Sequence, residues 1–343
     1  MQRKKFISSA FIAMGSLKAM SEGFSTTNMD DPNKTKIPPN LKIGDTIAIC
    51  SPAGFITLAD CMVAINMMES WGFKIKIGSS IGKKDFTFGG TDEERTADFQ
   101  QMLDDTSVMA IMCARGGYGI VRIIDRLNFA NFLKKSKWII GFSDATVLHS
   151  HINKNFGIPT IHSKMCNSFV DPAIAEPIQL ETLDSIRKCL MGENMSYNIP
   201  INPNNKNGIA KGILIGGNLK TLESLAASKS DINTKNKILF VEDTGEYLYS
   251  IDRMFFNLKR SGKLSHLAAL VVGGFKIKKD DDGEAFGKTL EQIVLEKVSE
   301  YSYPVCFNFP VGHQKNNFAL KCGIVHSLFV NQEKVVLEEF ILK

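Results

Sequence analysis

Blocks of apolar residues alternate with polar stretches along the first half of the chain and predict strands followed by helices. An apolar run at residues 46–50 closes with a turn at 51–54, and residues 58–71 then show helical apolar spacing. The same succession recurs at 109–127 and at 138–153. Because repeated strand, turn and helix units build a parallel sheet covered by helices, we predict an α/β domain in this half.

The second half of the chain has a different pattern. From residue 167 to 207 it is mixed, with one helical stretch at 177–191 and a polar loop at 202–207, so we place the domain connection there. Strand-like runs at 324–330 and 334–342 indicate more antiparallel pairing than in the first half. The predicted organisation is a leader and linker at 1–40, an N-terminal domain at 41–166, the connection at 167–207 and a C-terminal domain at 208–343.

The first residues resemble an export signal. Arg3, Lys4 and Lys5 precede an apolar run from Phe6 to Met14, in an order similar to a degenerate twin-arginine signal. A basic leader without a targeting role explains these features equally well. Periplasmic and cytoplasmic locations therefore both stay open, and no later segment reaches transmembrane length.

Composition supports two ordinary globular domains. A chain of 343 residues exceeds the usual size of a single core, and 44% hydrophobic residues supply enough apolar material for two. The 41 basic and 36 acidic residues are spread along the chain, so the net charge of +5 gives nucleic-acid binding little support. The seven cysteines lack C-x-x-C or zinc-finger spacing, and we expect buried free thiols.

The segment Gly141-Phe142-Ser143-Asp144-Ala145 lies between a predicted strand and a predicted helix, which is the position of a nucleophile elbow. A serine there stands at a helix N-terminus, whose free amides stabilise negative charge on an attacked carbonyl. The motif differs from G-x-S-x-G at its last position. The alternative is that Ser143 or Asp144 only caps the following helix.

A glycine-rich turn, Arg115-Gly116-Gly117-Tyr118-Gly119, follows the apolar strand at 109–113. It lacks the G-x-G-x-x-G spacing and the lysine of a P-loop, which disfavours a nucleotide site. Adjacent glycines let backbone amides approach a substrate, so this loop is a candidate second oxyanion donor. A tight turn that needs positive φ explains the glycines about as well.

A serine nucleophile needs a base, and His313 is the best placed of the six histidines. It lies in a loop directly after an apolar run at 305–309, whereas His149 and His151 are expected in surface or packing roles on a helix. Cys113, the competing nucleophile, lies inside a strand without an activating neighbour.

The pair Glu242-Asp243 follows the apolar strand at 237–241. A carboxylate at this place is a candidate to orient the base and to stabilise its protonated form. Two solvated loop acids, or a helix cap at Asp243, explain the pair better when it is taken in isolation.

Taken together, these motifs resemble the LD-carboxypeptidases of peptidase family S66 over roughly residues 41–330, in the same order along the chain. The resemblance implies a flavodoxin-like N-terminal domain with a parallel sheet and a smaller α/β C-terminal domain with a mixed sheet. The matching segments are Gly141 to Ala145, Arg115 to Gly119, Gly216-Gly217-Asn218-Leu219, Glu242-Asp243 through Asp252-Arg253, and Gly312-His313.

The resemblance also implies a mechanism. Ser143 is the expected nucleophile, His313 the general base and then acid, and Glu242 the orienting carboxylate, with backbone amides of Asp144 and Gly117 as oxyanion donors. The reaction that the resemblance implies is acyl transfer, without a metal or cofactor.

The expected substrate is the murein tetrapeptide, from which terminal D-alanine is released. We hypothesise that Arg115, Tyr118 and Asn218 help to bind it. A homodimer is implied, and neither a nucleic-acid partner nor stable membrane insertion is expected.

Three segments depart from the family pattern. His162-Ser163-Lys164-Met165 stands where His-Gly-Pro-Met is usual, the segment Ala319 to Gly323 lacks a proline before the glycine, and Ala227-Ser228 replaces a common Gly-Thr. These positions lie beside the expected catalytic residues, so they put the substrate preference in question rather than the hydrolysis.

Two alternatives therefore stay open. One is a relative of the microcin C immunity peptidases, which cleave an aminoacyl-nucleotide analogue. The other is a noncatalytic muropeptide-binding module on the same scaffold.

Overall fold

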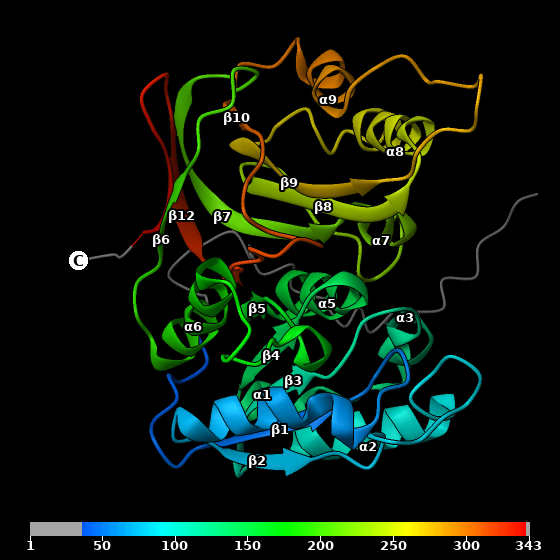
Figure 1. The fold of residues 1–343 in the computed structure, drawn as a ribbon, viewed down its shortest axis with the longest axis vertical. Coiled ribbons are helices and arrows are strands. Elements are labelled where there is room, and N and C mark those ends of the chain that lie inside the picture. Colours follow the sequence, from blue (N-terminus) through cyan, green and yellow to red (C-terminus); the bar gives the residue numbers. More distant parts are fainter. Residues whose placement is uncertain (1–35, 341–343) are drawn as a thin grey trace, which may run out of the picture.

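The computed structural model describes residues 36–340 and contains two β-sheets with helices packed around them (Figure 1). One sheet is mostly parallel and the other is mixed, so the predicted two-domain α/β fold is confirmed. The predicted leader falls almost entirely on residues 1–35, which lie outside the described residues. Within the part of the chain that is described, no helix combines the length and the apolar character needed to cross a membrane.

The first sheet has the strand order β2-β1-β3-β4-β5, all parallel, with β11 antiparallel at the edge beside β5. This is the flavodoxin-like order, in which ligands bind at the carboxyl ends of the strands. Its strands are β1 (Thr46–Cys50), β2 (Lys74–Ile77), β3 (Val108–Cys113), β4 (Trp138–Gly141), β5 (Thr160–His162) and β11 (Leu320–Cys322). Its helices are α1 (Leu58–Ser70), α2 (Asp92–Asp104), α3 (Ile120–Ile123), α4 (Ala130–Lys134) and α5 (Thr146–Phe156).

The second sheet has the order β10-β9-β8-β7-β12-β13-β6. The pairs from β10 to β7 are parallel, and the pairs from β7 through β12 and β13 to β6 are antiparallel, as expected for the end of the chain. Its strands are β6 (Ser196–Ile199), β7 (Gly208–Asn218), β8 (Ile238–Glu246), β9 (Ala269–Ile277), β10 (Val305–Cys306), β12 (Val325–Val330) and β13 (Val335–Glu339). Helix α6 (Pro177–Met191) precedes β6, and α7 (Leu219–Ser224), α8 (Leu248–Arg260) and α9 (Leu290–Val298) accompany the sheet.

Of the three buried apolar clusters in the described residues, one spans both domains. Ile140 and Ile161 of the first sheet belong to the same buried cluster as Leu214, Phe240 and Val271 of the second. The seven cysteines are all buried and free, as predicted. Because close-packed apolar contacts fix relative positions, residues from the two domains can form one site at this junction.

Two strands end later than the sequence pattern indicated, and one ends earlier. Strand β8 continues through Glu242 to Glu246 instead of ending at Val241, and β9 reaches Ile277, whereas the apolar run from Ala268 to Gly273 predicts an end at Gly273. Polar residues are tolerated here because the register between the two strands shifts after Val241 and again after Thr244. The apolar run at 305–309 forms a strand only at Val305–Cys306.

Candidate active site

Ser143 occupies a strained turn between β4 and α5. It is half-buried, begins a single 3₁₀ turn (Ser143–Ala145), and has a φ of +60°, which is uncommon for a residue other than glycine. A side chain on Gly141 would place its Cβ 2.8 Å from the Ala145 Cβ, so the turn requires glycine there. A serine on a tight, strained strand-to-helix turn is the geometry of a nucleophile elbow.

The glycine-rich loop after β3 runs directly against this serine. A Cβ on Gly116 would lie 3.0 Å from the Ser143 Cβ and 3.1 Å from its Oγ, and Gly117 has a φ of +105°. The Gly116 carbonyl also accepts a hydrogen bond of 3.0 Å from the Gly54 amide. The glycines therefore serve both of the purposes considered for them, a turn with positive φ and a close approach of backbone to Ser143.

The Asp144 side chain is buried and bonded to the start of α3. Its Oδ2 accepts a 2.8 Å hydrogen bond from the Ile120 amide, which ties the elbow to the start of α3. Burial raises the pKa of this carboxyl to about 6, opposed by that hydrogen bond and by the charge of Arg95. Any oxyanion role for Asp144 belongs to its main-chain amide.

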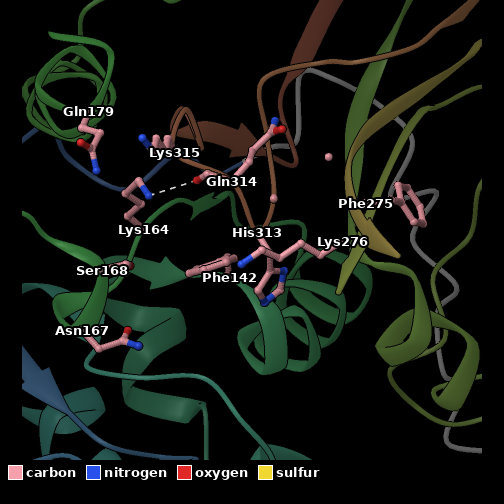
Figure 2. A pocket seen from close by; sticks show the side chains of 12 residues that line it. Phe142, Lys164, Asn167, Ser168, Gln179, Phe275, Lys276, His313, Gln314 and Lys315 are labelled. Carbon is pink, nitrogen blue, oxygen red and sulfur yellow. Dashed lines mark hydrogen bonds between the residues drawn. The ribbon is translucent and has the colours of Figure 1, made fainter. Parts of the chain in front are cut away.

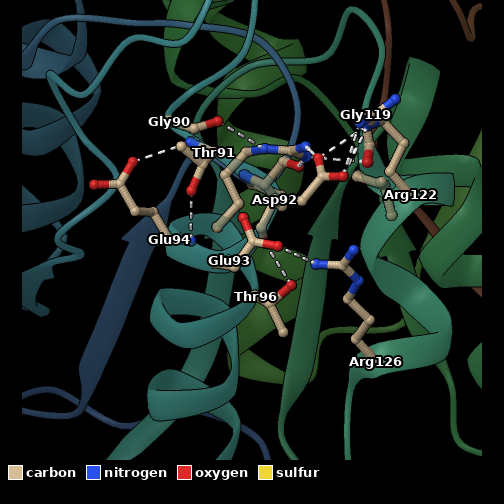
Figure 3. A network of polar contacts seen from close by, with 12 residues as sticks. Gly90, Thr91, Asp92, Glu93, Glu94, Thr96, Gly119, Arg122 and Arg126 are labelled. Atoms are coloured by element: carbon tan, nitrogen blue, oxygen red, sulfur yellow. Dashed lines mark hydrogen bonds and ion pairs between the residues drawn. The ribbon is translucent and has the colours of Figure 1, made fainter.

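Arg95, on α2, holds the loops around the elbow in place. Its fully buried guanidinium donates to the carbonyls of Pro52 at 2.5 Å and Gly119 at 3.0 Å, and it pairs with Asp92. Asp92 in turn pairs with Arg122 at 2.8 Å, within the polar network at the start of α2 (Figure 3). One rigid planar cation thus fixes the loop after β1 and the end of the glycine-rich loop relative to each other.

The second domain contributes a hydrogen-bonded pair. The His313 Nδ1 lies 2.7 Å from the Glu242 Oε2, and the Glu242 side chain is fully buried while that of His313 is 19% exposed. A buried carboxylate bonded to Nδ1 fixes the imidazole tautomer and leaves Nε2 available as a base.

Glycines make room for this pair. Glu242 lies opposite both Gly273 and Gly274, where the register of β8 and β9 shifts. A Cβ on Gly312 would lie 2.6 Å from the Glu242 Cβ, and the Gly312 amide donates to Asn317 Oδ1 at 2.8 Å. The loop that carries His313 can therefore pack onto the carboxylate only because glycine precedes the histidine.

The pair meets the elbow at the domain junction. The imidazole of His313 contacts the ring of Phe142, with ring centroids 4.8 Å apart, and Phe142 directly precedes Ser143. Thr146, three residues after Ser143, accepts a 3.0 Å hydrogen bond from the Asn218 amide at the end of β7. The structure thus brings the histidine and glutamate of one domain to the serine-bearing turn of the other.

The other histidines on or near α5 have packing roles. His149 is buried with Nε2 2.8 Å from the Gly141 carbonyl, and burial lowers its pKa to about 4. His151 is buried beside Ser230, 2.9 Å away, and stacks on Phe129.

Burial raises the pKa of Cys113 to about 12, which argues against a thiolate nucleophile. Residues 36–340 contain no group of three or more histidine, cysteine or acidic side chains placed to hold a metal ion.

A cavity of about 590 Å³ opens beside His313 (Figure 2). The ionisable side chains in its lining are His313 and three lysines, Lys164, Lys276 and Lys315, and the rest of the lining includes Phe142 and Gln179. The cavity therefore offers positive charge next to the imidazole.

Models of two protein domains match the chain. The model described as the LD-carboxypeptidase N-terminal domain matches residues 47–163, and that of the LD-carboxypeptidase C-terminal domain matches residues 211–328. The chain belongs to the LD-carboxypeptidase family. The family and the serine-type peptidase class predicted from the motifs are thereby confirmed.

Similarity to known proteins extends over nearly the full chain. A Bacillus subtilis protein named "Probable murein peptide carboxypeptidase" is 30% identical over 88% of this chain and 94% of its own length. The crystal structure of muramoyltetrapeptide carboxypeptidase from Oxalobacter formigenes has a TM-score of 0.77 at 28% identity, covering 86% of this chain and 99% of that one. The Escherichia coli microcin C7 self-immunity protein MccF is 25% identical over 88% of this chain and 95% of its own length.

The substrate-binding residues hypothesised from the sequence do not share one cavity. Arg115, Gly117 and Tyr118 line a second cavity of about 460 Å³, and the Arg115 guanidinium donates to the Phe55 carbonyl at 2.9 Å. Tyr118 is 54% exposed.

Asn218 lies outside both cavities and is buried. Its Nδ2 donates to Asp243 Oδ1 at 2.9 Å, and its Oδ1 caps α7 through the Thr221 amide at 3.0 Å. These contacts give it a role in joining β7, β8 and α7, and substrate binding by Asn218 stays a prediction.

Several residues of the site were not found from the sequence. Arg95, Phe142 as a contact of His313, and the glycines opposite Glu242 became evident only from tertiary contacts. Lys164 carried a signal, because the segment His162 to Met165 departs from the family pattern, but its position in the cavity required the fold.

Proposed function

We propose that this protein is a serine carboxypeptidase that releases terminal D-alanine from murein tetrapeptide by hydrolysing its L,D-amide bond. The observation that supports this most directly is the Glu242–His313 hydrogen bond packed against Phe142, the residue before Ser143, in a chain of the LD-carboxypeptidase family. The names of the relatives, murein peptide and muramoyltetrapeptide carboxypeptidases, support the substrate.

In the proposed reaction His313 takes the proton of the Ser143 hydroxyl while the oxygen attacks the carbonyl carbon of the scissile amide. Glu242 stabilises the imidazolium that forms. The backbone amides of Gly117 and Asp144 donate to the developing oxyanion. The C–N bond then breaks, the leaving amine takes the proton from His313, and water activated by the same imidazole hydrolyses the acyl-enzyme ester.

The decisive experiment is release of D-alanine from purified murein tetrapeptide by the wild type and by Ser143→Ala. We expect a loss of about 10⁶-fold in kcat, because removing the nucleophile leaves only binding and the oxyanion donors. Ser150→Ala, a substitution of a buried serine in α5, is the matched control and should retain turnover. Undiminished turnover by Ser143→Ala would exclude the proposed nucleophile.

The second candidate is cleavage of an aminoacyl-nucleotide analogue, as in the microcin C immunity peptidases. One observation favours it: the cavity beside Gly117 exposes the aromatic side chains of Phe86 and Tyr118, which are suited to stack on a base. Mass analysis after incubation with an aminoacyl sulfamoyl adenosine tests this candidate beside the tetrapeptide. Tetrapeptide binding without turnover of either compound would instead support a noncatalytic muropeptide-binding module.

The homodimer implied by the family resemblance stays a prediction. Light scattering coupled to size-exclusion chromatography tests it, with a mass of about 76 kDa for two chains of 38.0 kDa as the expected result.

A further inference from the structure

Lys164 is a buried cation in the lining of the cavity beside His313. It follows β5, where His162 ends the strand, and it is 7% exposed. Its Nζ donates one hydrogen bond of 3.2 Å, to the Gln314 carbonyl. No carboxylate lies within 4.0 Å of this ammonium in residues 36–340. A lysine ammonium has three N–H donors, so two of them have no hydrogen-bond acceptor among the described residues.

The other lysines of the cavity differ from Lys164. Lys315 is exposed and forms an ion pair with Glu176, and Lys276 is exposed. Water solvates both of these charges. Burial lowers the pKa of Lys164, because its ammonium has lost water without gaining a counter-charge.

A buried ammonium without a counter-charge lowers the free energy of unfolding unless an anion binds to it. A buried charge that lacks a partner reduces stability, and one long hydrogen bond to a backbone carbonyl is weak compensation. A neutral side chain would fill the same place at lower cost. Figure 2 shows Lys164 beside Gln314 and Lys315 in the lining of the cavity. The position of the ammonium therefore points to a ligand with negative charge.

The position of His313 indicates which part of the substrate lies there. In the proposed reaction the leaving amine takes its proton from His313, so the leaving residue occupies the cavity that His313 lines. In a carboxypeptidase the leaving residue is the last of the peptide, and its free carboxylate is one carbon away from that amine.

We infer that the Lys164 ammonium binds the terminal carboxylate of the residue that is released. This inference rests on the proposed function and names the specificity contact of the same site. Lys164 lies in the segment His162-Ser163-Lys164-Met165, one of the three segments that depart from the family pattern.

The test compares two substrates that differ only in charge, the murein tetrapeptide and the same peptide ending in D-alaninamide. We expect wild-type kcat/KM to favour the free carboxylate at least tenfold, which is the usual worth of one charge-assisted hydrogen bond. Lys164→Met should cleave both peptides with kcat/KM values within about threefold of each other, with the loss on the free acid mainly in KM. Lys164→Arg should restore part of the preference.

Lys276→Met is the matched control, because it removes an exposed lysine from the same cavity and should keep the preference. Thermal unfolding of Lys164→Met should occur at the wild-type temperature or above it, since an unpaired buried charge is removed. A preference that survives in Lys164→Met, or that disappears in Lys276→Met instead, overturns the inference.

Failure of the proposed function gives a different result. If the wild type cleaves neither peptide, the proposed function is wrong. Calorimetric titration of both peptides into the Ser143→Ala variant, and into a double variant that also carries Lys164→Met, then still measures the preference in binding. A tenfold weaker binding of the free acid to the double variant supports the carboxylate contact. Equal binding of both peptides to both variants, or no binding at all, contradicts it.

Discussion

The Nδ1 of His313 lies 2.7 Å from the Oε2 of Glu242, although 71 residues separate them in the chain. The carboxylate is fully buried at a register shift between two parallel strands, and the imidazole reaches it from a loop that glycine allows to approach. This bond joins two elements of the C-terminal domain into the unit that meets the elbow of the N-terminal domain.

Glu242→Gln should lower kcat by about 10³ to 10⁴-fold, because an amide of the same shape no longer fixes the tautomer or stabilises the imidazolium. Steady-state release of D-alanine measures the effect. Asp243→Asn is the matched control: this neighbouring acid accepts from Asn218 and from the amides of Lys220 and Thr244, not from His313, so its effect on kcat should be much smaller. A kcat of Glu242→Gln within tenfold of the wild-type value would contradict the role assigned to Glu242.

Gly117→Ala should reduce kcat by about 10² to 10³-fold, the usual cost of losing one oxyanion donor. Alanine rarely adopts the φ of +105° found at Gly117, so the backbone must shift and its amide must move relative to Ser143. Gly44→Ala imposes a similar strain at a φ of +91° where the added Cβ meets open space. If the two variants lose equal activity, the effect is general strain and not loss of a donor.

Arg95→Met should lower the free energy of unfolding by about 3 to 5 kcal/mol, because it leaves Asp92 and the carbonyls of Pro52 and Gly119 without their buried partner. Urea denaturation measures this. Arg122→Met removes the partly exposed cation that also pairs with Asp92, and it should cost less than about 1 kcal/mol. Equal losses for the two variants would show that Arg95 has no special place in the network.

Asp144→Asn should change how stability depends on pH. Burial raises the pKa of Asp144 in the folded protein to about 6 from 3.8. The contribution of this carboxyl to the free energy of unfolding is therefore complete below about pH 4 and is lost as the pH rises through 6. Asparagine does not titrate, and the variant should therefore gain about 3 kcal/mol relative to the wild type between about pH 4 and pH 7. Denaturant unfolding of both proteins across this range measures the difference, and a constant difference would contradict the raised pKa.

The same variant tests the oxyanion assignment. Because the Asp144 side chain bonds to the Ile120 amide and only its main chain is assigned to the oxyanion, Asp144→Asn should keep kcat within about tenfold of the wild type. A loss of 10³-fold or more would show that the carboxylate itself takes part in the reaction.

Local sequence determined the elements that have strong periodic patterns. Apolar runs such as those of β1, β3 and β4 predicted buried parallel strands, and α6 was predicted with the bounds that the structure has, because strand and helix periods are properties of neighbouring residues. Short or polar elements gave no such signal. Strand β2 is a four-residue edge strand with two lysines. Helix α2 is rich in charged residues, and its N-cap, Thr91, was not recognised from the sequence. The resemblance of separated motifs supplied the order of the expected catalytic residues.

Tertiary structure decided how those residues meet. The contact of His313 with Phe142 and the burial of Lys164 depend on the apolar cluster that spans the two domains. The shift in register that places Glu242 opposite two glycines depends on the pairing of β8 with β9. The same packing placed Arg115 and Asn218 away from the cavity beside His313. The physical reason is that periodicity reports which face of an element is buried, whereas distances between side chains far apart in the chain are fixed only when close packing selects one arrangement of the elements.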